Sequence, residues 1–373
     1  MQRMSKRIWM VGAFSDNFGD RVLQRSNSDL LREYFDCDFT YLNCQKTFFS
    51  KNLIKSINKN ADMLFFAGGG LIFRRDMDKS VSGWQFNCEI ENIKEIKVPI
   101  VFNGIGFNRF PYQPDFKPGM WDHLQETINC SALFSVRNSG TLEALKENGI
   151  NVSKVQITPD CGIFIRTEDY HHSMFDNNLK IGLNWASDRA TQRFSGNWAN
   201  KLMVVLKVLK NTNANVYLIE HLMPNELNVD IKLAMRQMFK EELGERGHVL
   251  FDKLHDLYPM FDYNSTLFSD IYKKMDLVLG MRGHSGLISF GLNTPFIGLG
   301  QHNKIRFFME DVGLEHNIVK LNQTDEQDED ELKEKVDRIL SNVQEEKCNI
   351  SNKLAIEKAK KDAWFEKIAG LIK

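Results

Sequence analysis

Short apolar segments alternate with amphipathic segments along almost the whole chain. The apolar segments are hydrophobic at nearly every position, which is typical of strands buried on both faces of a parallel sheet. Between them, apolar residues recur every three or four positions, as in helices that cover a sheet. The pattern predicts an α/β fold with parallel sheets covered on both faces. The predicted strands are RIWMVGA, DFTYLN, ADMLFF, VPIVFNGIG, ALFSVR and VQITPD in the first half, and KIGLNW, NVYLIE, HVLF, LVLG and PFIGL in the second.

A polar stretch, RTEDYHHSMFDNNLK at residues 166–180, divides the chain into two halves. A length of 373 residues also favours two domains over one. Each half repeats the strand–helix pattern of a doubly wound, Rossmann-like domain, which binds ligands at the carboxyl ends of its strands. We therefore predict an N-terminal domain over residues 1–170, a C-terminal domain over 178–325 and a cleft between them. Apolar positions at helical spacing predict C-terminal helices over residues 326–373 that pack on the body.

Charge, cysteine spacing and the length of apolar runs narrow the possible functions. The formal net charge is -1, so the chain lacks the basic field that nucleic-acid binding needs. The six cysteines show no CxxC or zinc spacing, which predicts reduced core thiols and no metal site. The N-terminal MQRMSKRIWMVGAF continues into DNFGDR instead of a cleavage site, and so reads as a first strand. No apolar stretch approaches membrane-spanning length, so we expect a cytoplasmic protein whose membrane contact is peripheral.

The stretch LVLGMRGHSGLISFGLNTPFIGLGQHNK, residues 277–304, carries the strongest candidate chemistry. An apolar strand leads into Arg282 and His284, and a predicted helix from Ser285 to Leu292 follows. Backbone N–H groups and the helix dipole at such a junction favour anionic ligands. The pattern therefore predicts a site for a donor that carries a phosphate and a carboxylate. The alternative is an arginine that pairs with a nearby Asp and a histidine that caps a turn.

Two glycine-bearing loops follow strands in the N-terminal half. In SDNFGDRVL the Asn and Gly suit a tight turn and the Asp suits a helix N-cap. In AGGGLIFRRD the glycines let a backbone pass close to a ligand or to another backbone. Neither loop has the GxGxxG spacing of a dinucleotide site, so each is either a ligand loop or a structural turn. The candidate residues are Asn17, Gly19 and Asp20, and then Gly68, Gly69, Gly70 and Arg74.

Other polar clusters also come directly after predicted strands. The loops NGIGFNRF and FSVRNSGTLEAL supply Arg109 and Arg137, and ITPDCGIF supplies a turn at Pro159 and Asp160. Each of these has an ordinary reading as a helix cap, turn or loop residue. Their regular position after strands nevertheless predicts an enzyme with its site at the strand ends. The candidates in the second half are Asn184, Trp185, Asp188, Arg189, Arg193, Glu220, His221, Lys304 and Arg306.

The order of these motifs resembles the polysaccharide pyruvyl transferase family. The resemblance spans roughly residues 8–315 and depends on NFGD, GGG, GIG, SVRN, the TPD turn and above all MRGHS followed by G, P and K. It implies the GT-B architecture of two Rossmann-like domains. It also implies a transferase that uses phosphoenolpyruvate to place a pyruvate ketal across two hydroxyls of a sugar. Such a pyruvyltransferase would act in the biosynthesis of bacterial surface polysaccharide, either exopolysaccharide or capsule.

The resemblance also implies roles for particular residues. Arg282 is expected to clamp phosphoenolpyruvate through paired hydrogen bonds, and His284 to act as general acid and base. Arg189 or Arg193 is our hypothesis for a second clamp, with Ser285 and Lys304 completing the donor site. No metal and no cofactor beyond the donor substrate is expected. The N-terminal loops, Asn17, Gly19, Asp20, Gly68, Gly69, Gly70 and Arg74, are expected to face the acceptor, a sugar or a lipid-linked oligosaccharide at the inner face of the membrane.

Two departures from the family pattern keep other functions open. Gly283 replaces a bulky residue, and Asn138 replaces an aspartate. One alternative is a GT-B glycosyltransferase that uses a nucleotide sugar, in which Glu220 would bind the two ribose hydroxyls. The other is a non-catalytic member of the family that binds glycan.

Overall fold

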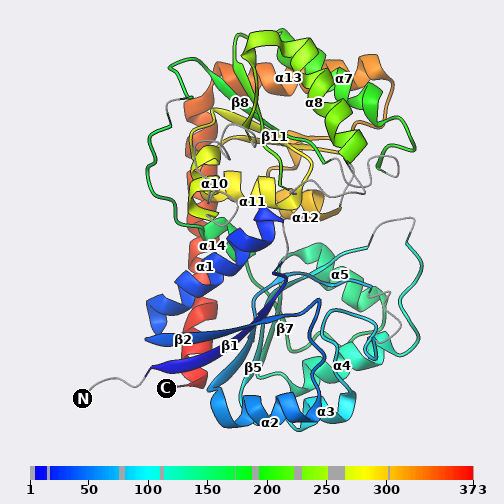
Figure 1. Ribbon diagram of the computed structural model, residues 1–373, viewed down its shortest axis with the longest axis vertical. Coiled ribbons are helices and arrows are strands. Elements are labelled where there is room, and N and C mark those ends of the chain that lie inside the picture. The colour runs from blue at the N-terminus through cyan, green and yellow to red at the C-terminus, as the bar shows by residue number, and fades with distance from the viewer. Residues whose placement is uncertain are drawn as a thin grey trace. The chain divides into compact units, whose positions relative to one another are not determined.

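The computed structural model divides the chain into two compact units (Figure 1). The N-terminal unit comprises Met1–Ser15, Leu23–Gly162 and Ile356–Lys373, and the C-terminal unit comprises Asp16–Val22 and Ile163–Ala355. The predicted ranges 1–170, 178–325 and 326–373 therefore do not coincide with the units, because both ends of the chain exchange segments. The structure describes residues 5–14, 17–74, 80–109, 113–172, 174–186, 193–221, 229–250, 265–300 and 303–372.

The N-terminal unit is built on a parallel sheet of seven strands in the order β2-β1-β3-β5-β6-β7, with β4 paired to β5. Strand order reverses between β1 and β3, as in other doubly wound sheets. The strands are β1 Lys6–Gly12, β2 Cys37–Asn43, β3 Met63–Phe66, β4 Gly69–Ile72, β5 Ile100–Phe107, β6 Leu133–Val136 and β7 Val155–Ile157. The helices are α1 Phe18–Tyr34, α2 Lys51–Asn60, α3 Ile90–Lys94, α4 Met120–Cys130 and α5 Ser139–Glu147, followed by the 3-10 helix η1 Cys161–Phe164.

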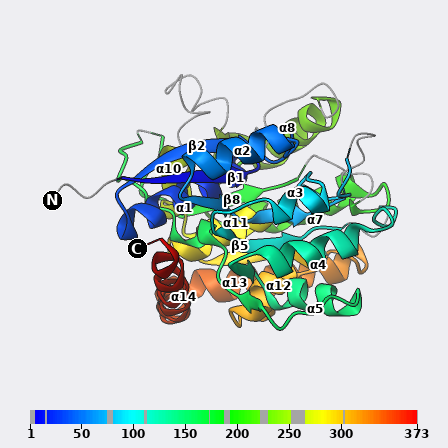
Figure 2. The same cartoon turned by 90° about the horizontal axis from the view of Figure 1, so that it is seen from below.

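The inner strands β3 and β5 are buried on both faces, as their continuously apolar sequences require, whereas the edge strands β2 and β7 are partly exposed. On one face, Phe66 of β3 stacks on Phe102 of β5 with 4.0 Å between ring centroids, beneath α2 to α5. On the other face lie α1 and the C-terminal part of α14, which spans Val343–Leu371 (Figure 2). There the Trp364 indole donates a hydrogen bond to Asn103 Oδ1 at 2.8 Å, and the Asn103 amide donates to Asn27 Oδ1 at 2.7 Å.

The C-terminal unit contains a six-stranded parallel sheet in the order β10-β9-β8-β11-β12-β13. Its strands are β8 Lys180–Asn184, β9 Asn215–Leu218, β10 Gly247–Val249, β11 Leu277–Gly280, β12 Phe296–Leu299 and β13 Ile318–Val319. Taken in chain order this is 3-2-1-4-5-6, the arrangement of a Rossmann sheet, whose switch point lies between its first and fourth strands. Those strands are β8 and β11, so the fold directs a ligand to the carboxyl ends of this pair.

Helices cover both faces of the second sheet as well (Figure 1). Helices α7, α8 and α13 bury one face, and α10, α11 and α12 bury the other. The prediction of an α/β fold with parallel sheets and C-terminal helices is confirmed. The bounds are α7 Trp198–Lys210, α8 Val229–Leu243, α10 Ser265–Lys273, α11 Gly283–Gly291, α12 Asn303–Asp311 and α13 Asp325–Ser341, with the 3-10 helices η2 Gly244–Arg246 and η4 Glu315–Asn317.

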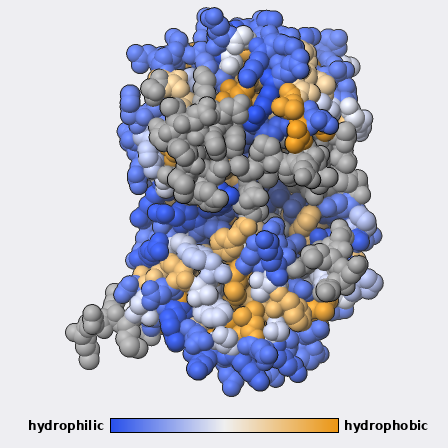
Figure 3. All heavy atoms as spheres, in the orientation of Figure 1, coloured by the Kyte–Doolittle hydropathy of each residue, from blue (hydrophilic) through white to orange (hydrophobic). Residues whose placement is uncertain are grey.

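Among the residues that the structure describes, eight large apolar side chains are exposed. On the face seen in Figure 3, apolar groups form small areas among polar side chains. In the described part of the chain, no helix is both long enough and apolar enough to cross a membrane. The exposed large apolar residues are Tyr41, Phe48, Val81, Ile157, Leu179, Val229, Leu233 and Ile356.

Candidate functional site

The turn from Arg282 to Ser285 occupies the switch point of the C-terminal sheet. Arg282 follows β11 and forms the N-cap of α11, which begins at Gly283, two residues earlier than predicted. The buried side chain of Asn184, at the end of β8, accepts the Arg282 N–H at 3.2 Å and donates to the Ile219 carbonyl at 2.7 Å. A single amide therefore ties together the ends of three adjacent strands and fixes the backbone from which Arg282 projects.

Ser285 shapes this turn from within. Its side chain is fully buried, and its hydroxyl donates to the Arg282 carbonyl at 2.6 Å. The described contacts of Ser285 are therefore structural, and its role in donor binding stays a prediction. Arg282, Gly283 and His284 are half-buried, although the Nε2 atom of His284 is itself buried.

A buried pair of neutral groups lies beneath the two candidate residues. The His221 Nε2 atom is hydrogen-bonded to the Tyr272 hydroxyl, and both side chains are buried. Burial, reinforced by the positive charges of Arg282 and His284, holds the pKa of His221 well below its usual range. Burial also raises the pKa of Tyr272 well above its usual range, which Arg282 opposes. This layer therefore stays uncharged at neutral pH and supplies no negative charge to Arg282 or His284.

The first turn of α1 belongs to this site and not to the N-terminal sheet. The Phe18 N–H donates to the His221 carbonyl at 3.0 Å, and the Phe18 ring stacks on Phe268 at 4.3 Å. A Cβ atom added at Gly19 would lie 2.0 Å from His284 Nδ1, so the Gly19 backbone lies directly against the imidazole. The placement of Asn17, Gly19 and Asp20 in the N-terminal unit is wrong, because residues 17–22 belong to the C-terminal unit, and their role toward an acceptor stays a prediction.

Asn17 and Gly283 are explained by close contacts within this region. The Asn17 side chain accepts the Gly19 N–H at 2.9 Å and so caps the first turn of α1. A Cβ atom at Gly283 would lie 3.3 Å from the Cβ of Lys304, in the first turn of α12. The small residue therefore lets α12 approach the Arg282–His284 turn, and Lys304 is half-buried beside it.

Two arginines, Arg189 and Arg193, are the candidates for a second clamp on the donor. Arg189 and the nearby Asp188 lie outside the described residues. Arg193 is half-buried and lines a depression of about 500 Å³ at the start of α7 and α13. In that depression Lys201 is held by Asp325 and Asp328, both at 2.7 Å. The residues that line it are Arg193, Phe194, Ser195, Asn197, Lys201 and Leu321 to Asp325, and neither Arg282 nor His284 is among them.

The glycine triplet of the N-terminal unit allows two backbone segments to pack closely together. Gly68 and Gly69 have φ angles of 75° and 88°, and a Cβ atom at Gly68 would lie 2.8 Å from the Asn103 carbonyl oxygen. Both are buried and allow β4 to pack beside β5, while their predicted contact with an acceptor stays a prediction. Gly70 is half-buried, and the half-buried Arg74 donates to the Asp115 carbonyl at 2.6 Å.

Two further motifs of the N-terminal unit are joined by a buried ion pair. Arg137, after β6, contacts Asp160 of the TPD turn at 3.0 Å, and both side chains are buried. The Asn138 side chain accepts the Thr141 N–H at 2.8 Å and thereby caps α5. An aspartate would cap the helix in the same way, so the Asn138 departure has a structural explanation.

Glu220 is already committed to two cations. Its carboxylate lies 3.2 Å from Lys232 Nζ and accepts a hydrogen bond from Arg236 Nε at 3.0 Å. The side chain of Glu220 is buried. A nucleotide-sugar transferase would need this carboxylate to accept hydrogen bonds from two ribose hydroxyls. In this structure the carboxylate instead binds Lys232 and Arg236.

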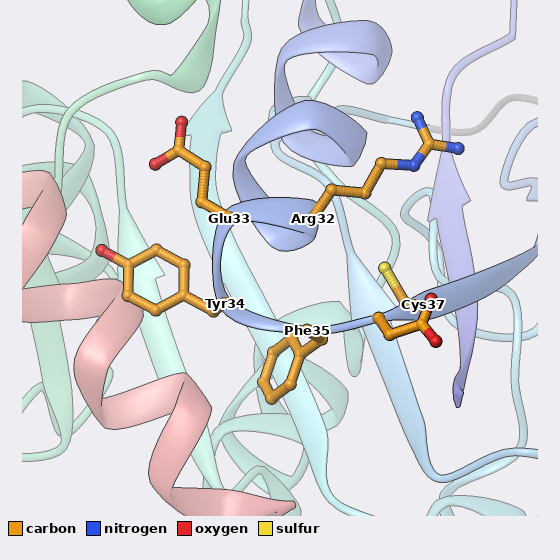
Figure 4. A pocket seen from close by; sticks show the side chains of 6 residues that line it. Arg32, Glu33, Tyr34, Phe35 and Cys37 are labelled. Carbon is orange, nitrogen blue, oxygen red and sulfur yellow. The ribbon is translucent and has the colours of Figure 1, made fainter. Parts of the chain in front are cut away.

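A second depression, of about 430 Å³, lies in the N-terminal unit, where the end of α1 leads into the start of β2 (Figure 4). The Tyr34 ring points toward α14, where it stacks on Phe365 at 5.7 Å. Burial raises the pKa of Cys37 to about 11, so this thiol is protonated at neutral pH and is a poor nucleophile. Among the described residues, no three His, Cys, Asp or Glu side chains are grouped so as to hold a metal ion.

Three residues beside the candidate site are not predicted by the sequence pattern. Tyr272 and Phe268 lie on α10, where their spacing reads as the apolar face of an ordinary core helix. Tyr272 carries a hydroxyl in that face, but nothing in its local pattern shows that the hydroxyl faces His221. The same is true of Phe18 in the NFGD motif, because a large apolar residue at a helix start predicts only packing.

Two parallel sheets of this kind, with long C-terminal helices, define a GT-B-like protein. A putative UDP-N-acetylglucosamine 2-epimerase from Listeria monocytogenes matches with a TM-score of 0.55 at 13% identity, over 93% of this chain and 91% of that chain. The UDP-GlcNAc 2-epimerase from Neisseria meningitidis bound to UDP-GlcNAc matches with a TM-score of 0.54 at 12% identity, over 97% and 99%. Anabaena Alr3699/HepE in complex with UDP and glucose matches with a TM-score of 0.51 at 10% identity, over 98% and 100%. At these identities the likeness is one of fold, and it confirms the predicted GT-B-like architecture.

Sequence similarity then assigns the chain to a family. The profile described as polysaccharide pyruvyl transferase matches residues 17–303. The chain therefore belongs to the polysaccharide pyruvyl transferase family, as its motifs indicated. No curated protein sequence matches the chain significantly.

Proposed function

We propose that this protein transfers pyruvate from phosphoenolpyruvate to two hydroxyls of a sugar, forming a ketal during the synthesis of a bacterial surface polysaccharide. One observation carries the proposal. Arg282 and His284 project from a single turn at the switch point of the C-terminal sheet, and that turn opens α11. A permanent cation, a titratable imidazole and a helix N-terminus therefore converge where such sheets bind ligands.

The donor matches the charge of this turn. Phosphoenolpyruvate carries a phosphate and a carboxylate, and a guanidinium binds either of them through paired hydrogen bonds. We assign the primary clamp to Arg282 and a supporting positive charge to Lys304, whose stem packs beside Gly283. Arg193, or Arg189, remains our proposal for a second arginine on the donor.

The chemistry requires a group that gives and takes protons. A proton adds to the methylene carbon of phosphoenolpyruvate, and a sugar hydroxyl attacks the adjacent carbon and loses its own proton. Phosphate then leaves with the electrons of the C–O bond, and the second hydroxyl attacks the same carbon and loses its proton. The products are the ketal and inorganic phosphate. We assign these proton transfers to His284, since a positioned imidazole contributes roughly 10²–10⁴-fold to rate.

Some candidate residues for binding the acceptor lie in the N-terminal unit. Two predicted acceptor residues of the N-terminal unit are half-buried: Gly70, within β4, and Arg74, just after that strand. We propose a sugar or a lipid-linked oligosaccharide as acceptor, which would place the protein in the cytoplasm at the inner face of the membrane. The ion pairs of Glu220 weigh against a nucleotide-sugar glycosyltransferase.

Phosphoenolpyruvate binding measured by calorimetry tests the donor assignment. Wild type is expected to bind it in the micromolar range, Arg282→Ala to lose that binding, and His284→Ala to keep the binding and the fold. Arg246→Ala is a matched control, because Arg246 lies in the same unit before β10, where its side chain binds the carbonyl of Lys210.

Two outcomes would overturn the proposal. Binding of UDP with no binding of phosphoenolpyruvate would move the protein to the glycosyltransferases. Binding of neither would leave the non-catalytic, glycan-binding alternative. Release of phosphate from phosphoenolpyruvate in the presence of a panel of free sugars, absent in His284→Ala, tests the reaction itself.

A further inference from the structure

The Gly19 backbone fits against His284 more tightly than any residue with a side chain would allow. A Cβ atom added at Gly19 would lie 2.0 Å from Nδ1, 2.3 Å from Cγ and 2.5 Å from Cβ of His284. Rotation of the imidazole about its own bonds moves Nδ1, but it does not move Cβ. Relief of the third contact therefore requires the first turn of α1 or the first turn of α11 to shift by about 1 Å, given ordinary carbon–carbon separations of 3.5–4.0 Å.

The turn that carries Gly19 is fixed by three contacts with the rest of the C-terminal unit and by one hydrogen bond within the turn. The Phe18 ring is almost parallel to Phe268, with an interplanar angle of 8°, and the Phe18 side chain is 1% exposed. The Phe18 N–H donates to the His221 carbonyl, and Val22 lies in the same apolar core, one helical turn further on. The Asn17 side chain holds the Gly19 N–H.

We propose that the segment Asn17–Val22 is a positioning element for His284, and that Gly19 is the residue by which it sets the place of the imidazole. This inference rests on the proposed function, because His284 matters most as the proton-transfer group. The NFGD motif follows the first strand of the N-terminal unit in the sequence. The proposal nevertheless assigns it the positioning of a side chain in the C-terminal unit. Phe18 anchors the segment, Asn17 closes its turn, and Gly19 provides a flat surface against which the ring rests.

The variant Gly19→Ala tests this directly. We expect the protein to remain folded and phosphoenolpyruvate to bind within threefold of wild type, since Arg282 is not touched. We expect kcat for phosphate release to fall on the order of 100-fold, because a misplacement of about 1 Å in a catalytic group can cost that much. The matched control is Gly370→Ala, in α14, where a Cβ atom would meet nothing within 4 Å.

A readout that does not depend on the reaction accompanies the kinetics. The chain has nine histidines, so a carbon-13 spectrum of labelled imidazole Cε1–Hε1 groups gives nine cross-peaks. His284→Ala identifies the His284 peak by its loss. We expect Gly19→Ala to move that peak more than any of the other eight, and Gly370→Ala to leave it in place. Phe18→Leu, which keeps an apolar anchor but removes the ring stack, is expected to move it less.

The outcomes separate the two proposals. An unmoved His284 peak and an unchanged kcat in Gly19→Ala would overturn the positioning role. If Gly19→Ala fails to fold, an unmoved peak in Phe18→Leu would overturn it instead. If wild type binds no phosphoenolpyruvate while the peak still moves as expected, the proposed reaction fails and the positioning of His284 stands.

Discussion

Asn138 stands where the family pattern has an aspartate, and it keeps the helix-capping function that the aspartate would have. Its amide oxygen accepts the Thr141 N–H at 2.8 Å and the Thr141 hydroxyl at 2.7 Å, both at the start of α5. We expect Asn138→Asp to unfold at nearly the same urea concentration as wild type. Asn138→Ala should lower the free energy of unfolding by about 1 kcal/mol, the usual cost of losing an N-cap.

Urea unfolding followed by circular dichroism measures this difference. Phosphoenolpyruvate affinity serves as the control, and it should be equal in all three proteins. A large gain in phosphate release for Asn138→Asp would contradict the capping explanation and restore the carboxylate to the reaction.

His123 provides a test of pH dependence at a single residue. Its Nδ1 accepts the Trp84 indole N–H at 2.8 Å, so Nε2 carries the proton and donates to the Cys88 carbonyl at 2.8 Å. Burial lowers the pKa of His123 below its ordinary value of 6.5, an effect that the Cys88 carbonyl partly opposes. Below that value the unfolded chain takes up a proton more readily than the folded one, so the stability contributed by this group is lost as pH falls.

We therefore expect wild type to lose stability between pH 7.5 and pH 5.5, and His123→Phe to lose less over the same interval. The variant should be less stable than wild type at pH 7.5, because the Trp84 N–H is left without its acceptor, and the gap should narrow toward pH 5.5. Thermal melting at each pH measures this. His171→Gln, at an exposed position, is the control. A gap that stays constant across pH would show that His123 is not the titrating group.

At the scale of the elements, the end of α14 is fixed to the N-terminal sheet by a buried polar chain. Trp364 donates to Asn103, and Asn103 donates to Asn27, whose own amide donates to the Ala67 carbonyl at 3.0 Å. We expect Trp364→Phe to lower the free energy of unfolding by about 1–3 kcal/mol, the cost of leaving a buried acceptor unpaired.

Chemical denaturation of Trp364→Phe checks this expectation. Trp121→Phe is a suitable control, because Trp121 is only half-buried in α4 and packs beside Phe116. Equal losses in both variants would mean that only ring volume matters and that the hydrogen bond contributes nothing.

The elements also show what could be predicted from sequence. Continuous apolar runs such as ADMLFF and LVLG gave the strands within a residue or two, because burial on both faces leaves a pattern that needs no knowledge of partners. The two-residue strand β13 has no such pattern, and its pairing with β12 depends on contacts made after the chain has folded. The strand at Gly69–Ile72 was hidden for another reason, because glycines that permit a close backbone approach are also typical of a loop.

At the scale of the whole molecule, the site was predictable only in part. The shared place of Arg282 and His284 at the start of α11 could be predicted, because the strand, the turn and the helix start are all local in sequence. The contact between Gly19 and His284 could not, because it joins positions 265 residues apart, the difference between 284 and 19, and no periodic pattern records such a pairing. For the same reason the loop SDNFGDRVL was assigned to the sheet that precedes it in the chain.

The division of the chain has a consequence for how such proteins can recombine. The unit that carries Arg282 and His284 is not encoded by one continuous stretch, since Asp16–Val22 is separated from the rest by 140 residues that belong to the other unit. A crossover in the linker near residue 170 would unite a C-terminal half with a foreign Phe18–Gly19 turn. We therefore expect such a hybrid to keep the packing around His284 only where the incoming Phe18–Gly19 turn still fits against that imidazole.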